Sequence, residues 1–270
     1  MLRARIITAV ILAPLVIAAI YLLPLAGYAL FFWLIAAAGT YEWAGLAGLV
    51  GRGARIACLI PLAVLALVTW QFPQYWQWVL WLGAAFWALA AVAVIAYPRG
   101  GRLCVHAALA IPAGLIVGWA AWMGLVVIRA EPGGANWVLW LLFLVWGADI
   151  GAYFAGRRFG RRKLAPQVSP GKTWEGLIGG IVVSLLLTLV MLVPMGAFAL
   201  WWVPVIVGLV VVSVFGDLFE SVMKRARGVK DSGALLPGHG GVLDRIDSVV
   251  AVLPVFAVVL VTVHQVPWVP

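Results

Sequence analysis

Nine long runs of apolar residues constrain the fold of this chain more than any other feature of its sequence. A helix needs roughly 20 apolar residues to cross the hydrocarbon core of a bilayer. We expect the runs to form transmembrane helices at residues 6–23, 28–50, 56–70, 76–97, 105–128, 136–155, 174–195, 200–220 and 248–266. We expect the first run to be a retained span and not a signal peptide, because no small-residue cleavage site follows it. The sequence therefore predicts an all-α, polytopic integral membrane protein with about nine transmembrane helices.

The composition excludes a water-soluble domain. Charged residues make up 10% and hydrophobic residues 66% of the 270 residues, and the mean hydropathy is +1.12. Because a soluble domain carries about 25% charged residues, the apolar side chains must face lipid as well as one another. The spans take up most of the length, so we expect a single membrane domain over residues 1–270. Residues 1–148 hold the first five spans and the start of the sixth, and residues 149–270 carry two polar loops on the cytoplasmic side.

The basic residues lie almost entirely in alternate loops, which predicts an orientation. Seventeen of the 18 Lys and Arg residues precede the first run or lie between runs two and three, four and five, six and seven, or eight and nine, whereas Arg129 lies on the other side. An excess of Lys and Arg marks cytoplasmic loops. We therefore expect the N-terminus and these loops in the cytoplasm and the C-terminus outside. The net charge of +9 has the same origin, so we expect no nucleic-acid partner.

The acidic residues are few and concentrated in the second half of the chain. Seven of the nine carboxylates lie between residues 149 and 247, and Asp149 and Asp217 each follow a long apolar run. An ionisable group at membrane depth costs about 2.5–3.5 kcal/mol on insertion scales, so it normally has a function or a partner. These two aspartates are therefore the first candidates for a functional site.

The spacing of polar residues around the eighth and ninth runs indicates a metal and phosphate site. Asp217, Ser221 and Lys224 share one helix face, although an intrahelical salt-bridge ladder would have the same spacing. Asp244 and Asp247, three residues apart, would point to one side of a helix. A divalent cation such as Mg²⁺ would relieve the repulsion between them, whereas the alternative is an N-terminal cap of the ninth span.

Two loops add groups that are suited to phosphate. Gly238, Gly240 and Gly241 bracket His239 in a segment of tight turns, where backbone N–H groups can bind anions. The segment Ser169-Pro170-Gly171-Lys172-Thr173 is expected to form a turn before the seventh span, and a helix N-terminus with these residues suits phosphate. The basic residues of that loop would equally anchor it to anionic lipid headgroups. Together, carboxylates, cations and glycine turns at one membrane face favour phosphoryl or nucleotidyl transfer to a lipid phosphate.

Residues 221–247, SVMKRARGVKDSGALLPGHGGVLDRID, resemble the signature of the phosphatidate cytidylyltransferases, also called CDP-diacylglycerol synthases. That signature runs S-x-apolar-K-R, K-D, P-x-H-G-G and D-R-x-D, and the stretch shows no departure from it. Residues 149–176, DIGAYFAGRRFGRRKLAPQVSPGKTWEG, look like the family's second characteristic region. Residues 1–148 match only in general character. The resemblance implies that residues 149–270 form the catalytic part, which transfers the cytidylyl group of CTP to phosphatidic acid and gives CDP-diacylglycerol and pyrophosphate.

The resemblance also implies roles for individual residues. The metal ligands would be Asp217 and Asp244, with Asp247 as a further ligand or a supporting group. Phosphate contacts are expected from Ser221, Lys224, Arg225, Lys230 and Arg245. Asp231 and His239 would shape the loop or assist proton and phosphate handling. Substrate contacts are expected from Asp149, Ser169, Lys172, Gly240 and Gly241.

The same resemblance implies Mg²⁺, together with a second cation such as K⁺, as cofactors. It implies CTP, phosphatidic acid and membrane lipids as partners, a homodimer, and a bacterial inner membrane with the site facing the cytoplasm. A transporter is the main rival class, because intramembrane acids and interrupted helices also serve transport. The acids here gather at one face, and no inverted repeat is visible. A structural anchor would leave the polar loops unexplained, and the DGxxAR-type pattern of CDP-alcohol phosphotransferases is missing.

Overall fold

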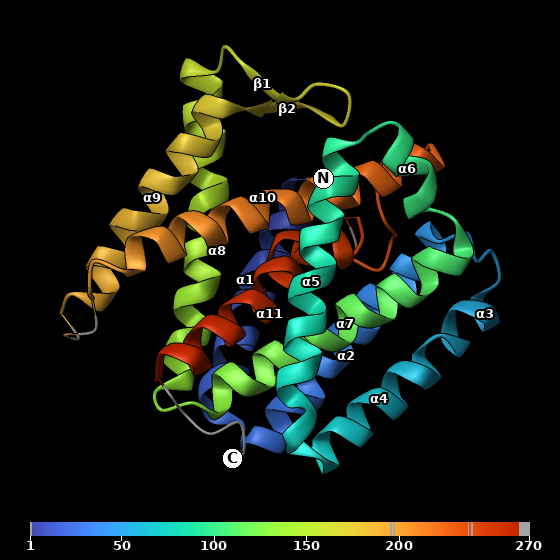
Figure 1. Cartoon of the computed structure of the whole chain (residues 1–270), viewed down its shortest axis with the longest axis horizontal. Coiled ribbons are helices and arrows are strands. Elements are labelled where there is room, and N and C mark those ends of the chain that lie inside the picture. Colours follow the sequence, from blue (N-terminus) through green and yellow to red (C-terminus); the bar gives the residue numbers. More distant parts are fainter. Residues whose placement is uncertain (1, 195, 197, 237, 239, 265–270) are drawn as a thin grey trace.

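The computed structural model describes residues 2–194, 196, 198–236, 238 and 240–264, and this part of the chain is almost wholly helical (Figure 1). The long helices are α1 (Leu2–Leu22), α2 (Leu25–Leu46), α4 (Leu59–Gln71), α5 (Trp76–Ile95), α7 (Ala107–Ala130), α8 (Gly134–Phe159), α9 (Trp174–Leu192), α10 (Trp202–Arg227) and α11 (Leu243–His264). The short elements are helices α3 (Arg52–Ala57), η1 (Pro73–Tyr75) and α6 (Arg99–Cys104), and strands β1 (Lys163–Ala165) and β2 (Ser169–Thr173).

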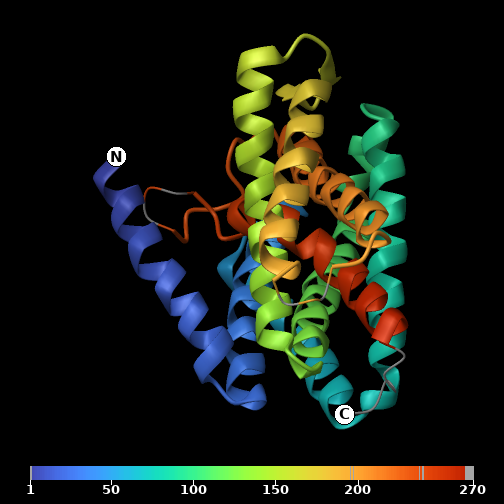
Figure 2. The ribbon, with the colours of Figure 1, turned by 90° about the vertical axis from the view of Figure 1, so that its left-hand side faces the viewer.

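Each apolar run of the sequence is helical over most of its length, so the all-α, polytopic membrane class is confirmed. Among the described residues, eight segments are long and apolar enough to cross a membrane. The remaining run corresponds to α1, whose apolar part, Val10–Leu22, is shorter than these eight segments. The α1 helix and the α3–α4 segment lie at the outside of the bundle, as Figures 1 and 2 show. The orientation of the termini stays a prediction.

Three segments differ from expectation. The third run is divided at Cys58 into α3 and α4, and the helix starts in the preceding loop, at Arg52. The ninth helix starts at Leu243 and not at residue 248, so Asp244 and Asp247 both lie in it. The turn predicted at residues 169–173 is wrong, because this segment is strand β2. Its antiparallel pairing with β1 gives the backbone of this polar loop hydrogen-bond partners, and a two-stranded ribbon has edges that tolerate Pro170.

Small residues bring α8 and α9 into close contact along their length, and the two views show them side by side (Figures 1 and 2). A Cβ atom on Gly151 would lie 2.6 Å from the carbonyl oxygen of Gly179, and one on Gly180 would lie 2.8 Å from that of Ala148. Such close approach is typical of small residues at transmembrane helix interfaces. The β1–β2 hairpin joins the paired ends of these helices, so its position is fixed relative to both.

Helices α10 and α11 pack closely near their polar residues. A Cβ atom on Gly216 of α10 would lie 2.6 Å from the backbone oxygen of Asp247 in α11. Farther along α11, Ala251, Val252 and Phe256 are fully buried in the apolar core. The polar ends of two central helices are therefore held side by side by apolar packing along the rest of their length.

The packing of α8 on α9 gives a prediction. Replacing Gly151 by Ala would place a methyl group 2.6 Å from a backbone oxygen and 2.8 Å from the Val183 side chain. Overpacking of this kind typically costs about 1–3 kcal/mol. We expect Gly151→Ala to lower the midpoint of thermal unfolding of the detergent-purified protein by several degrees.

The matched control is Gly208→Ala in α10, because no atom lies within 4 Å of a Cβ built at Gly208. This variant should unfold at or slightly above the wild-type temperature, because Ala is a better helix former than Gly. Equal midpoints for the two variants would contradict the close approach of α8 and α9.

Candidate active site

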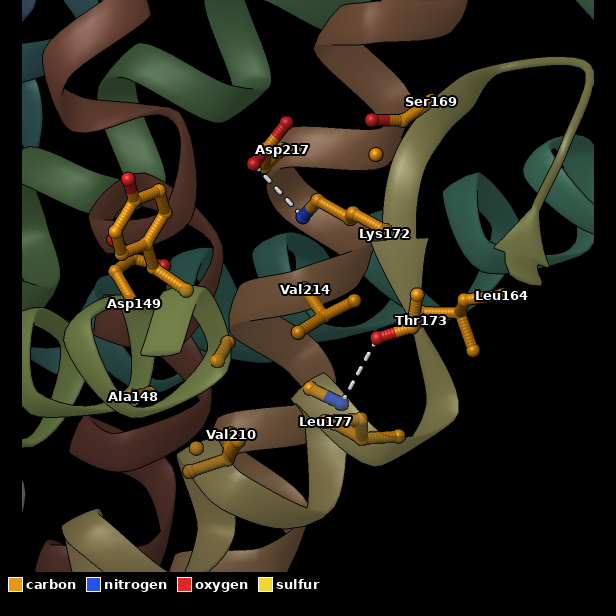
Figure 3. A pocket seen from close by; sticks show the side chains of 15 residues that line it. Ala148, Asp149, Leu164, Ser169, Lys172, Thr173, Leu177, Val210, Val214 and Asp217 are labelled. Carbon is orange, nitrogen blue, oxygen red and sulfur yellow. Dashed lines mark hydrogen bonds and ion pairs between the residues drawn. The ribbon is translucent and has the colours of Figure 1, made fainter. Parts of the chain in front are cut away.

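A cavity of about 410 Å³ lies where the β1–β2 hairpin meets α8, α9 and α10 (Figure 3). Its polar side chains come from elements that are far apart in the sequence. Helix α8 contributes Asp149 and Tyr153, strand β2 contributes Ser169, Lys172 and Thr173, and α10 contributes Asp217. Residues of the 149–176 region therefore meet Asp217, the other aspartate that the sequence singles out, at one cavity.

An ion pair crosses this cavity. The ammonium of Lys172 lies 2.8 Å from Oδ2 of Asp217, and Figure 3 shows the two side chains pointing toward each other. Asp149, on the neighbouring wall, interacts electrostatically with both. The hydroxyl of Ser221 donates to Oδ1 of Asp217 at 3.3 Å. Lys172 therefore pairs with Asp217 near a second carboxylate, and all three side chains line the cavity.

A second set of charges lies behind the first, between α10 and α11. The ammonium of Lys224 donates to Glu220 at 2.8 Å and to Asp244 at 2.7 Å. Both carboxylate side chains are less than one-tenth exposed. The charge of Asp247 interacts with those of Asp217 and Glu220, so it connects the two sets electrostatically. Lys224 therefore neutralises part of an excess of negative charge at the junction of α10 and α11.

The carboxylate of Asp244 also organises the loop before α11. Its Oδ2 accepts hydrogen bonds from the backbone N–H groups of Ser232 at 2.9 Å and Gly241 at 2.8 Å. Within the described part of this loop, Leu236 N–H donates to the carbonyl of Gly240. Gly238 and Gly240 have φ values of 77° and 82°, which non-glycine residues rarely adopt. The predicted tight glycine turns are therefore confirmed at these two positions.

The structure brings together most of the predicted site residues. Asp149, Ser169, Lys172 and Asp217 line the cavity. Ser221 donates to Asp217, and the charge of Asp247 interacts with that of Asp217. Lys224 and Asp244 pair with each other between α10 and α11. Arg225 is exposed and contacts the hairpin through the carbonyl of Val168 at 3.4 Å. Lys230, Asp231 and Arg245 are exposed on the loop and the start of α11. His239 lies outside the described residues.

Two buried carboxylates were missed by the sequence analysis as site residues. Glu220 binds Lys224, and Glu42 of α2 accepts hydrogen bonds from Ser232 and Leu243. Each lies within an apolar helix. A charge at membrane depth is costly, and this argument singled out Asp149 and Asp217. The same argument could have identified Glu42 and Glu220 from the sequence.

The donor set around Asp217 is compatible with a hard cation. Among the described residues, no group of three His, Cys, Asp or Glu side chains is placed to hold a metal ion by itself. Mg²⁺ commonly uses one or two carboxylates and completes its shell with water and substrate phosphates. Asp217 offers a carboxylate of this kind in the cavity lining, and the charge of Asp247 interacts with it.

The Lys224 cluster gives a second prediction. Lys224→Met removes the cation and leaves two buried carboxylates without a counter-charge, a loss that typically costs about 3–5 kcal/mol. We expect this variant to unfold at a clearly lower temperature than wild type, or to fail to accumulate in the membrane. Lys230→Met is the matched control, because Lys230 is exposed and forms no ion pair with the described residues. Wild-type stability of Lys224→Met would show that the cluster does not stabilise the fold.

Comparisons with known proteins agree with this geometry. Residues 3–263 match the family model described as the cytidylyltransferase family. A phosphatidate cytidylyltransferase of Pseudomonas aeruginosa is 45% identical, over 96% of this chain and 97% of the relative. One of Haemophilus influenzae is 36% identical, over 95% of this chain and 98% of the relative. The resemblance that the sequence motifs indicated is thus confirmed, and the chain belongs to the cytidylyltransferase family.

Proposed function

We propose that this protein is a phosphatidate cytidylyltransferase that works at the cavity between the hairpin and α10. In this reaction an oxygen of the phosphatidic acid phosphate forms a bond to the α-phosphorus of CTP. The bond between that phosphorus and the oxygen bridging to the β-phosphate breaks, and pyrophosphate leaves with the electron pair. CDP-diacylglycerol is the lipid product. The observation that carries the proposal is the Lys172–Asp217 pair, which crosses the cavity in a chain of this family.

The two partners of that pair have complementary tasks. Lys172 lines the cavity, and a bound triphosphate offers it oxygens in place of Asp217. Phosphoryl and nucleotidyl transfer depend mainly on positioning and charge stabilisation. Lys172 therefore orients the triphosphate and stabilises the negative charge that develops on the leaving group. Ser221 and Asp149 hold the two sides of the site, one against Asp217 and one against Lys172.

We propose that Asp217 and Asp247 would bind Mg²⁺, which would neutralise negative charge on the substrate phosphates. Asp244 already accepts hydrogen bonds from Lys224, Ser232 and Gly241, so we place it behind these ligands, holding the loop. A second cation such as K⁺ remains part of the proposal. So do a homodimer, an inner-membrane location and a site that faces the cytoplasm.

A groove next to the cavity fits the lipid substrate. It has a volume of about 720 Å³ and is lined by α5, the hairpin, α9 and α10. Most of its lining is apolar, and Leu164, Leu177 and Val214 line both the groove and the polar cavity. A phosphatidic acid molecule with its acyl chains in the groove therefore has its phosphate at the Lys172–Asp217 pair. This arrangement lets the lipid enter sideways from the bilayer while CTP enters from water.

The reaction can be tested directly with the detergent-purified protein. Release of pyrophosphate should require CTP, Mg²⁺ and phosphatidic acid together, with an equal amount of CDP-lipid. Asp217→Asn and Lys172→Met should each lower kcat by about 100-fold or more, the usual effect of removing one charge-stabilising group. Lys163→Met, an exposed lysine on β1, should keep wild-type activity. Near-normal turnover of Asp217→Asn would remove Asp217 from the metal site.

The lipid groove gives a separate prediction. Val211 of α10 lines the groove but not the polar cavity, so Val211→Trp should fill space intended for an acyl chain. We expect the KM for phosphatidic acid to rise about 10-fold while the KM for CTP stays unchanged. Leu186→Trp is the control, because Leu186 is exposed on α9 and lines neither space. Equal KM changes for both substrates would argue against the groove as the lipid site.

A further inference from the structure

Glu42 lies where a carboxylate is least expected. It is four residues before the end of the apolar helix α2, far in sequence from the family motifs, and its residue surface is 1% exposed. A buried carboxylate at membrane depth normally has a partner or a function. No Lys or Arg contacts it among the described residues, so its partners are not an ordinary ion pair.

The partners of Glu42 lie at both ends of the loop that precedes α11. Its Oε2 accepts a hydrogen bond from the hydroxyl of Ser232 at 3.1 Å and from the backbone N–H of Leu243 at 2.8 Å. Leu243 is the first residue of α11, and the first N–H groups of a helix have no partner within the helix. Glu42 therefore supplies an acceptor for the start of α11 from a helix about 200 residues earlier in the chain.

Two glycines of the loop pack directly on this carboxylate. Cβ atoms built on Gly233 and Gly241 would both clash with the Glu42 carboxylate, so neither position has room for a side chain. The other oxygen, Oε1, is buried beside Gly233 and has no hydrogen-bond partner in the described structure. The loop is therefore closed around Glu42, and backbone atoms of the loop take the place of solvent.

The same loop is held on its other side by the proposed catalytic site. Ser232 and Gly241 each donate a backbone N–H to Asp244, which binds Lys224. The hydroxyl of Ser232 points to Glu42, whereas its backbone N–H points to Asp244. Glu42 and Asp244 thus hold the loop from opposite sides, and a displacement of one side moves the donors of the other.

We propose that Glu42 is a positioning residue of the active site, which sets the geometry of Asp244 and Lys224 by fixing the loop of residues 232–243. The proposal rests on the cytidylyltransferase function proposed above for the effect on turnover. Glu42 touches no reacting atom. It acts through Ser232 and the start of α11, and a misplacement of about 1 Å in such a site can cost about 100-fold in rate.

The test compares Glu42→Leu, which has no acceptor, with Glu42→Gln, whose amide oxygen still accepts hydrogen bonds. We expect kcat of the folded protein to fall about 100-fold for Glu42→Leu and less than 10-fold for Glu42→Gln. The KM for phosphatidic acid should change less than threefold in both. Thr40→Val is the control, because Thr40 lies buried on α2 and its hydroxyl faces Gly118 of α7, away from the loop. It should keep wild-type kcat.

A double-mutant cycle guards against simple loss of folding. Ser232→Ala removes only the hydroxyl that contacts Glu42 and should lower kcat about threefold to tenfold. Combined with Glu42→Gln, the two losses should be less than multiplicative, because Ser232→Ala removes and Glu42→Gln weakens the same charge-assisted hydrogen bond. Multiplicative losses would overturn the proposal, as would wild-type kcat in folded Glu42→Leu.

Hydrogen–deuterium exchange separates this inference from the proposed function. In Ser232→Ala and Glu42→Gln, backbone amides of residues 232–243 should exchange faster, whereas those of the hairpin at residues 163–173 should not change. This readout needs no turnover, so it applies even if the wild-type protein releases no pyrophosphate. Unchanged exchange of residues 232–243 in both variants would overturn the positioning role whatever the activity of the enzyme.

Discussion

The placement of charges in an apolar chain is the constraint on which the rest of this structure depends. With only 10% charged residues, each carboxylate at membrane depth must find a cation or a set of donors. Lys224 satisfies Glu220 of its own helix and Asp244 of α11 at the same time. The junction of α10 and α11 is therefore fixed by charge as well as by the contact of Gly216 with the backbone of α11. The cavity that contains Asp217 lies beside this junction.

The proposed reaction also requires one site that binds both a water-soluble and a lipid substrate. The polar cavity and the apolar groove share three side chains, so one site has a charged part and a hydrocarbon part. The β1–β2 hairpin contributes to both parts, because Lys172 points to Asp217 while Leu164 and Val168 line the groove. The close packing of α8 and α9 holds the ends from which this hairpin extends. Packing far from the chemistry thus determines where the lysine is placed.

The loop before α11 shows how the site combines rigid and open parts. Its backbone is held by Glu42 on one side and Asp244 on the other, and its glycines leave no room for side chains near Glu42. On the hairpin side of the cavity, the Lys172 side chain is held by a single ion pair, to Asp217, and under the proposed function a substrate phosphate would replace that partner. A substrate would therefore rearrange the Lys172 side and leave the Asp244 side in place.

The sequence by itself determined the class of protein, the positions of the helices and the family. Apolar runs report burial in lipid, and the motifs at residues 149–176 and 221–247 are specific enough to indicate a cytidylyltransferase. It also predicted that Asp217 and Ser221 share a helix face, since that depends on the helical repeat alone. Only the tertiary structure decided that Lys172 pairs with Asp217, that Lys224 pairs with Asp244, and that Glu42 closes the loop. Such pairs depend on how helices tilt and cross, and the pattern of residues within one helix carries no information about that.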